Sequence, residues 1–313
     1  MNTITSLLSR HPFIASFTAA TLCAALAGPA LAEEGSGTVS GHFSWNWNFG
    51  NRVSYGANQT KGSGVVKEET RTVANFSRLE LALPATVTLS QGPAESLTIS
   101  ADDNLLPLMT TRVENDELII EADKSRGFST TREIRIRLTV KSLNGIRIQG
   151  SGDVVGDQLK CDKLDIAIAG SGDVNFKSIR TDEFRIGING SGDVAVAALE
   201  SKSVEAAIHG SGDIRLPSLQ ATRVNISVNG SGDVLAAGNA DTVDIEIKGS
   251  GDVRTGKLIA REAGVTIMAS GDAVVHAKEK LTASVYGSGD VRYAGSPAQV
   301  SRTVKGSGSI EAL

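Results

Sequence analysis

A short motif, Gly-Ser-Gly-Asp followed by Val or Ile, recurs along the second half of this 313-residue chain. Its nine copies and near-copies begin at residues 150, 170, 190, 210, 230, 249, 269, 287 and 306, which are 18 to 20 residues apart. A nearly fixed period of this length is typical of a solenoid, in which each repeat forms one coil and stacks on the next. The motif therefore constrains the fold more than any other feature of the chain.

The residues on both sides of the motif alternate between apolar and polar. With the first residue of each motif as position 0, apolar residues occupy positions −6, −4 and −2, as in Leu164, Ile166 and Ile168, and positions +4 and +6, as in Val174 and Phe176. Period-2 alternation rich in β-branched residues predicts one strand before each motif and one after it. At roughly 3.3 Å per residue, a coil traces about 65 Å, which suits a two- or three-sided parallel β-helix. The expected fold class is all-β, a single-stranded parallel β-helix with coils of about 20 residues.

The same parity predicts the direction of each motif side chain. Even positions face inward, so both glycines point in, while Ser and Asp point out. Position 0 is Ala once, at Ala269, which indicates a need for small size more than for a positive φ. Position +2 is Gly in all nine copies, so we expect it to supply a left-handed or sharply bent backbone. These structural glycines are Gly152, Gly172, Gly192, Gly212, Gly232, Gly251, Gly271, Gly289 and Gly308.

The first 32 residues are typical of a secretory signal peptide. Arg10 precedes an apolar run, and Ala30-Leu31-Ala32 is a small-x-small cleavage site. Removal of this segment takes away Arg10 and no acid, leaving 30 basic side chains of 31 against 35 acidic ones, a net charge of −5. Mild acidity argues against nucleic acid or an anionic membrane as partner. Only Cys161 then remains, so no intrachain disulfide can form.

Residues 33–68 differ in composition from the rest and are rich in Gly, Ser and Asn. We interpret them as a disordered linker. The alternate aromatic residues Trp45, Trp47 and Phe49 leave two other interpretations open, an extra strand that covers the open end of the helix and a patch that stacks on carbohydrate.

Residues 69–148 keep the alternation without the motif and continue into 149–313 without a shift in composition. Five or six strands are expected, around residues 76–83, 87–89, 97–99, 113, 118–120 and 134–140, with a short helical or irregular turn at 105–109. We therefore predict one domain over 69–313, whose irregular first coils begin the helix and shield its first edge.

Several stretches together resemble the GIN-domain family, which is described as the head domain of "putative autotransporter adhesins". They are Phe-Ser-Arg-Leu-Glu-Leu-Ala-Leu-Pro-Ala-Thr-Val from residue 76, Ala-Asp-Asp-Asn-Leu-Leu from residue 101, Glu-Leu-Ile-Ile from residue 117, and the serial Ile-x-Gly-Ser-Gly-Asp-Val. The resemblance covers roughly residues 72–313. It implies a right-handed β-helix in a bacterial envelope or secreted protein, and it brings no catalytic residues with it.

Parity predicts an outward column of carboxylates about 4.8 Å apart. Its members are Asp153, Asp173, Asp193, Asp213, Asp233, Asp252, Asp272 and Asp290. Neighbouring carboxylates at that distance repel by about 0.9 kcal/mol in water, which a solvated column tolerates. One hypothesis is a calcium-binding column; the other, which we favour, is that each Asp and Ser bonds the local backbone and shapes the bend. We therefore expect no cofactor, with calcium as the alternative.

Residues with catalytic potential form no convincing set. His42, His209 and His276 have no sequence-level partners, Cys161 is expected to be a buried inert thiol, and Arg185, Arg215, Arg223 and Arg254 are interpreted as scattered and solvated. We conclude that the chain is an exported non-enzymatic β-helix, periplasmic, displayed on the cell surface or secreted. It is expected to act through its surface on a glycan or an envelope protein, in adhesion or envelope interaction. A structural, self-associating envelope protein and a polysaccharide-active enzyme are the alternatives.

The ninth copy replaces Asp by Ser309, and the sequence ends at Leu313. The strands of the last coil, with Val304 and Ile310, would then present unpaired backbone groups and an apolar cross-section. From this pattern we expect end-to-end self-association. The core-facing position of Arg302 fits a coil at the rim of the helix.

Overall fold

The computed structural model describes residues 59–123 and 126–313 of the chain, and these fall into one compact unit. The signal peptide predicted at 1–32 and the aromatic stretch around Trp45 and Trp47 lie outside the described residues. Within the described ranges, no helix is long and apolar enough to cross a membrane.

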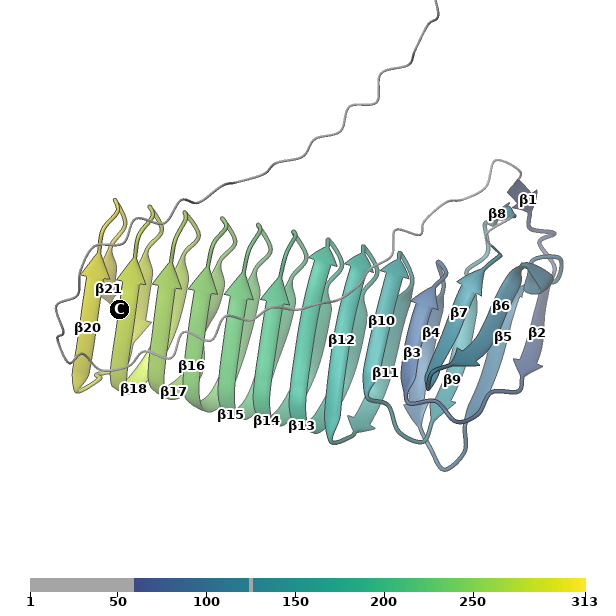
Figure 1. Cartoon of the computed structure of the whole chain (residues 1–313), viewed down its shortest axis with the longest axis horizontal. Helices are drawn as coiled ribbons and strands as arrows, with labels where there is room; N and C mark the ends of the chain where they lie inside the picture. Colours follow the sequence, from purple (N-terminus) through teal and green to yellow (C-terminus); the bar gives the residue numbers. More distant parts are fainter. Residues whose placement is uncertain (1–58, 124–125) are drawn as a thin grey trace, which may run out of the picture. The chain divides into compact units, whose positions relative to one another are not determined.

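The motif-bearing part of the chain is a β-solenoid, as the period and the alternation predicted. Its strands are β10 (Gly145–Gly150), β11 (Asp153–Lys160), β12 (Lys163–Gly170), β13 (Val174–Gly190), β14 (Val194–Ile208), β15 (Ile214–Val228), β16 (Val234–Ile247), β17 (Val253–Ile267), β18 (Ala273–Val285), β19 (Val291–Ala294), β20 (Gln299–Val304) and β21 (Ile310–Ala312). Neighbouring coils pair in parallel, with Val174 opposite Val194 and Val194 in turn opposite Ile214. Figure 1 shows these coils side by side along the solenoid.

The strand after one motif and the strand before the next join into a single element. β13 to β18 each continue through the bend opposite the motif, so the motif forms the turn that separates successive strands. Two of the repeats with fewer than 20 residues are shortened at that opposite bend. The register between β15 and β16 shifts between Leu216 and Leu219, and the register between β17 and β18 shifts after Arg254. The motif turns therefore stay aligned even where the period falls to 18 or 19 residues.

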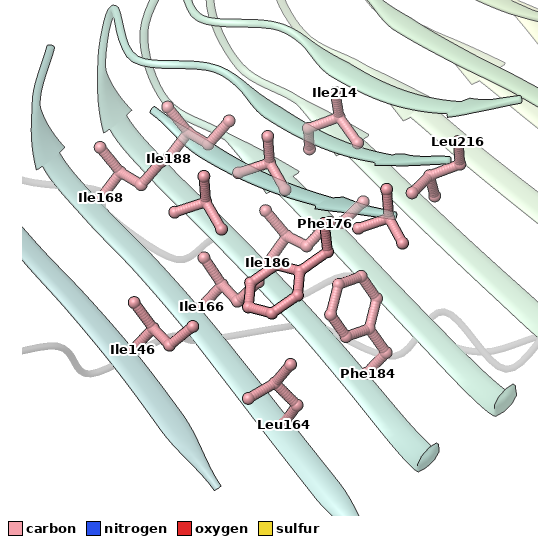
Figure 2. Packing of buried hydrophobic residues seen from close by; sticks show 14 of the residues in the cluster. Ile146, Leu164, Ile166, Ile168, Phe176, Phe184, Ile186, Ile188, Ile214 and Leu216 are labelled. Atoms are coloured by element: carbon pink, nitrogen blue, oxygen red, sulfur yellow. The ribbon is translucent and has the colours of Figure 1, made fainter. Parts of the chain in front are cut away.

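Inward-facing side chains form the core in stacks that run from coil to coil. Ile166, Ile186 and Ile226 occupy one such stack and expose 0%, 0% and 3% of their surface. Figure 2 shows Leu164, Ile168 and Phe184 among the residues that fill the same interior. The inward parity assigned from sequence is confirmed by this burial. Because successive coils contribute similar side chains, most of the apolar area is buried between neighbours.

The N-terminal strands do not follow the coil order of the sequence. β3 (Arg78–Ala82) and β4 (Thr86–Gln91) form a coil that pairs in parallel with β10 and β11 on one side. On the other side it pairs in parallel with β7 (Glu117–Ala122) and β9 (Arg135–Val140), which come later in the chain. The chain therefore forms an inner coil first, returns to form the outer one, and then crosses back to β10.

Antiparallel strands pair with the outer coil and with one another. β6 (Met109–Glu114) pairs with β7, β5 (Ser96–Asp102) pairs with β9, and β2 (Val66–Arg71) pairs with β5. The turn expected at 105–109 contains a short 3₁₀ helix, Leu106–Leu108. An antiparallel edge of this kind interrupts the parallel stacking of coils at this end.

The part of the expected linker that the structure describes is paired rather than free. β1 (Gln59–Lys61) pairs in parallel with β8 (Gly127–Ser129), a three-residue strand that the sequence patterns did not reveal. β2 begins at Val66, inside the segment interpreted as linker, and crosses the boundary placed at 68/69. The physical reason is backbone pairing with β5 and β8, which composition does not report.

Candidate functional site

The motif turns stack on one another through backbone hydrogen bonds. The Ser191 N–H donates to the carbonyl oxygen of Gly170 at 2.8 Å, and the Gly192 N–H donates to the same oxygen at 3.3 Å. This pair of bonds recurs in the described copies from Ser171 to Ser307, except that Ser270, in the copy that begins with Ala269, does not donate the corresponding bond. Backbone hydrogen bonds therefore hold the successive motif turns together, with one irregularity where Ala269 replaces Gly.

Close approach of the backbones explains the motif glycines. A Cβ atom added to Gly210 would lie 2.0 Å from the carbonyl oxygen of Gly190, and one added to Gly212 would lie 2.0 Å from that of Gly192. Neither distance is compatible with a side chain, so both positions need glycine for space. In the copy that begins with Ala269, position 0 carries a methyl group, which fits the absence of the hydrogen bond from the Ser270 N–H.

Of the two conformations expected for the +2 glycines, a left-handed or a sharply bent backbone, the left-handed one is wrong. Among the described residues, the motif glycines with φ clearly in the positive region are at position 0, with 106° at Gly150 and 146° at Gly170. No +2 glycine is among the positive-φ residues of the described ranges. The +2 position is restricted by contact with the preceding coil, a contact that a single repeat cannot reveal.

The eight motif aspartates form one column along the solenoid, which we call the Asp column. Oδ1 of each carboxylate accepts a hydrogen bond from the backbone N–H of the equivalent residue in the next coil, as from Asp193 to Asp173 at 2.8 Å and from Asp213 to Asp193 at 2.8 Å. The series runs from Asp153 to Asp290, whose Oδ1 accepts from the Ser309 N–H at 2.7 Å. In each case a side-chain carboxylate, and not a backbone carbonyl, is the acceptor for the N–H of the next coil.

Arginines at position +5 of alternate copies pair with this column. Arg215 donates to Oδ2 of Asp193 at 2.9 Å and to Oδ2 of Asp213 at 2.7 Å. Arg254 bridges Asp233 and Asp252 in the same way, at 2.9 Å each. Arg292 lies 3.9 Å from Asp272.

The interpretation of these arginines as scattered is therefore wrong for Arg215 and Arg254, which are exposed as expected but pair with the column in a repeated pattern. Arg185 is half-buried, and its Nε donates to Glu205 at 2.8 Å. The signal that could have found the first two is their common position +5 in copies four and six. Arginine is well suited to bridging, because its planar fork offers several donors to neighbouring carboxylates.

The bonding of the Asp column bears on the calcium hypothesis. One carboxylate oxygen of each aspartate already accepts a backbone N–H, and in the bridged pairs the other accepts from arginine. Within the described ranges, no group of three or more His, Cys, Asp or Glu side chains is placed to hold a metal ion. Calcium prefers six to eight oxygen ligands, so this arrangement favours the structural role. The metal hypothesis itself stays a prediction that titration can test.

A pocket of about 400 Å³ lies where the Asp column meets the N-terminal coils. Its walls come from the β3–β4 turn, the segment from β8 to β9 and the first motif. The polar residues that line it are Thr86, Ser129, Thr130, Arg132, Glu133, Ser151 and Asp153, and the apolar ones are Pro84, Ala85, Phe128 and Ile134. The segments are more than 60 residues apart at their extremes, so sequence patterns could not assemble this site.

The remaining candidates for chemistry are dispersed. His42 lies outside the described residues; His209 is exposed and His276 half-buried, on coils that are three repeats apart. Cys161 is half-buried, and its burial raises the pKa of the thiol, an effect that the Thr181 hydroxyl partly opposes and the nearby Asp162 carboxylate adds to. A raised pKa leaves less thiolate at neutral pH, so this cysteine is a poor nucleophile.

The chain matches the family described as "Putative auto-transporter adhesin, head GIN domain" twice, over residues 75–198 and 185–297. The two matches overlap and together cover more than two thirds of the chain. No curated protein matches it at a significant level.

Solved structures share the fold at low sequence identity. A putative adhesin from Parabacteroides merdae is 21% identical with a TM-score of 0.65, and the match covers 82% of this chain and 100% of that one. A putative adhesin from Parabacteroides distasonis is 23% identical with a TM-score of 0.65 and the same coverage. A putative lipid binding protein from P. distasonis is 23% identical with a TM-score of 0.64, again covering 82% and 100%. At these identities the likeness shows the fold alone.

Proposed function

Because this chain belongs to the family described as "Putative auto-transporter adhesin, head GIN domain", we propose that it is an exported, non-enzymatic protein that adheres to a glycan or an envelope protein through the outer surface of its solenoid. The observation that carries the proposal is the family match over residues 75–297, which spans both the N-terminal coils and most of the motif coils. Fold alone would not suffice, since one fold serves many functions.

The distribution of side chains supports action through the surface. The inward positions up to β18 are mostly apolar and buried, so the interior there is a packed core. The outward positions carry exposed serines such as Ser171 and Ser191, with carboxylates and arginines beside them. A stack of coils repeats this polar pattern many times, and a repeated pattern offers a large contact area to a surface that is itself repetitive.

Export and location are proposed from the sequence. Residues 1–32 have the charged start, the apolar run and the small-x-small site of a secretory signal. Periplasm, cell surface and medium are all compatible with such a signal. Fractionation of producing cells, with mass spectrometry of the mature N-terminus, would test this: an N-terminus at Glu33 is expected, and retention of residues 1–32 in the cytoplasm would contradict export.

The experiment that tests adhesion is a binding assay with the mature chain, residues 33–313, labelled with a fluorophore. Increasing concentrations are incubated with bacterial and host cells and with immobilised glycans and envelope proteins. We expect saturable binding to at least one surface. The control is Ile226→Asp, which places an unpaired charge in the core and should abolish the folded surface together with binding. Absence of saturable binding by the folded chain would contradict the proposal.

A second candidate function, structural self-association, is favoured by one observation. Val300 and Val304 of β20 stand in register with the buried Leu281 and Val285 of β18, yet they expose 40% and 46% of their surface. A coil of the same parity on a second copy would cover them. Sedimentation velocity over a range of concentrations tests this, with Val304→Lys expected to weaken association. A monomer at every concentration, with no difference between the two proteins, would exclude it.

A further inference from the structure

The Asp column is not neutralised evenly along the solenoid. From Asp193 to Asp252, every column carboxylate pairs with an arginine at position +5 of its own or the next coil. The first two copies have Val155 and Asn175 at that position instead. In the described residues Asp153 and Asp173 therefore have no ion-pair partner, and these two adjacent carboxylates lie at the N-terminal end of the column; at the other end only Asp290 lacks one.

The pocket of about 400 Å³ lies at that same end and includes Asp153. Oδ1 of Asp153 accepts the Asp173 N–H at 2.9 Å, and the Asp153 N–H donates to the Ala85 carbonyl at 2.9 Å. One bond thus holds the carboxylate of Asp153 and the other holds its backbone. Its second oxygen accepts no bond from the described residues and is not among their buried unpaired atoms, so it is open to a ligand.

A buried carboxyl group holds another part of the pocket wall. Asp102, only 2% exposed, accepts hydrogen bonds from the Gly64 N–H at 3.0 Å and from the Thr130 hydroxyl at 2.6 Å. The Thr130 hydroxyl in turn accepts from the Arg132 N–H at 2.9 Å. This chain of bonds holds the backbone of Arg132 in place. The Arg132 guanidinium has no ion pair within the described ranges.

From this arrangement we propose that the pocket is a sugar-binding site, which takes one neutral monosaccharide unit of a glycan. The inference rests on the proposed function and names the ligand class for it. Asp153 accepts from sugar hydroxyls, Arg132 donates to a hydroxyl or ring oxygen, and the exposed Ser151 hydroxyl serves as either. The half-buried Pro84 offers an apolar surface for the C–H face of the ring.

The size and charge of the pocket are the reasons for proposing a neutral monosaccharide. A volume of about 400 Å³ is near the lower end of the roughly 300–1,000 Å³ found for small-ligand sites. Glu133 is already engaged by Arg135, whose Nε donates to it at 2.8 Å, and Arg135 and the Thr86 hydroxyl lower the pKa of that carboxyl. Among the described residues that line the pocket, Arg132 then has a guanidinium without an ion pair, and Asp153 has one carboxylate oxygen without a hydrogen bond. This balance favours a neutral ligand with many hydroxyl groups over an anionic or a cationic one.

The test uses saturation-transfer NMR and calorimetry on the mature chain, residues 33–313. The probes are methyl glycosides of the common neutral hexoses and N-acetylhexosamines. Asp153→Asn removes the charge and one acceptor while its amide oxygen keeps the bond to Asp173, and Arg132→Gln removes the free cation. The matched controls are Asp233→Asn, at the same position four coils away, and Arg180→Gln, an exposed arginine paired with Glu200.

We expect at least one glycoside to bind, at least a tenfold loss of affinity in each pocket variant, and no change beyond twofold in either control. If glycosides bind equally to all five proteins, the site is elsewhere on the solenoid, and the pocket assignment is overturned while adhesion stands. The assignment is also overturned if the chain binds cells but none of the glycosides. If it binds neither cells nor glycosides, the proposed function fails with it.

Discussion

The hydrogen bond from each column aspartate to the next coil can be tested by comparing two substitutions at one position. Asp173 is the best choice, because its Oδ1 accepts the Asp193 N–H at 2.8 Å and it has no ion pair among the described residues. Asp173→Ala removes the acceptor and the charge. Asp173→Asn removes the charge and keeps an oxygen in the place of Oδ1.

Two energies determine the expected result. A hydrogen bond to a charged group contributes about 1.5–3 kcal/mol, and because Asp193 is only half-buried, water should replace part of it. Loss of the Asp173 charge also relieves repulsion from Asp153, about 0.9 kcal/mol in water at a 4.8 Å spacing before salt screening. That relief is common to both variants, so the difference between them isolates the hydrogen bond. We expect Asp173→Ala to be less stable than Asp173→Asn by about 1–2 kcal/mol.

The assay combines thermal unfolding with amide hydrogen exchange. For a domain of this size, 1 kcal/mol shifts the Tm by roughly 2–4 °C, so the alanine variant should melt about 2–8 °C below the asparagine variant. A solenoid can unfold in parts, so exchange at single amides provides the sharper measurement. In Asp173→Ala the Asp193 amide should exchange several-fold to about thirtyfold faster. The Asp233 amide, which donates to Asp213 at 2.9 Å, is the internal control.

Salt provides a second discrimination. In about 1 M salt the Debye length falls to roughly 3 Å, so the repulsion term vanishes while the difference between the two variants persists. Equal stability of the two variants, with an unchanged Asp193 amide, would refute the structural role of the carboxylate. The uniformity of the Asp column would then require another explanation, such as a ligand.

Three further predictions concern the core, the motif glycines and cations. Ile226→Asp should unfold the solenoid, because it buries a charge without a partner; an unchanged Tm would show that the parity assignment is wrong. Gly212→Ala should lower stability by more than about 2 kcal/mol, because its Cβ would lie 2.0 Å from the Gly192 oxygen; circular dichroism melts would detect this, and a neutral effect would mean that the coils separate easily. Millimolar calcium should change the Tm by less than about 2 °C, since one oxygen of each column carboxylate is already bonded to the backbone; a rise of several degrees that is abolished by Asp193→Asn together with Asp213→Asn would support a calcium column instead.

The sequence by itself determined the repeating part of this protein. The period of about 20 residues specified the coil, and the apolar positions around Ile186 and Ile226 specified which side faces the core. Both properties are local and recur in every coil, so a single chain carries the information many times over. The invariant glycine at position +2 likewise indicated a special position, although one of the two reasons assigned to it, a left-handed backbone, was wrong, and the close approach of the preceding coil is what excludes a side chain.

Only the tertiary structure decided the features that depend on contacts between coils and on long connections between strands. The placement of β7 and β9 outside β3 and β4 reverses the order that the sequence suggests, because strand alternation does not specify a neighbour. The partners of Arg215 lie 2 and 22 residues away and meet it only when the coils stack. The pocket at Asp153 joins three segments that no period relates. Those features are long-range, occur once each, and follow from how the strands are packed together in space.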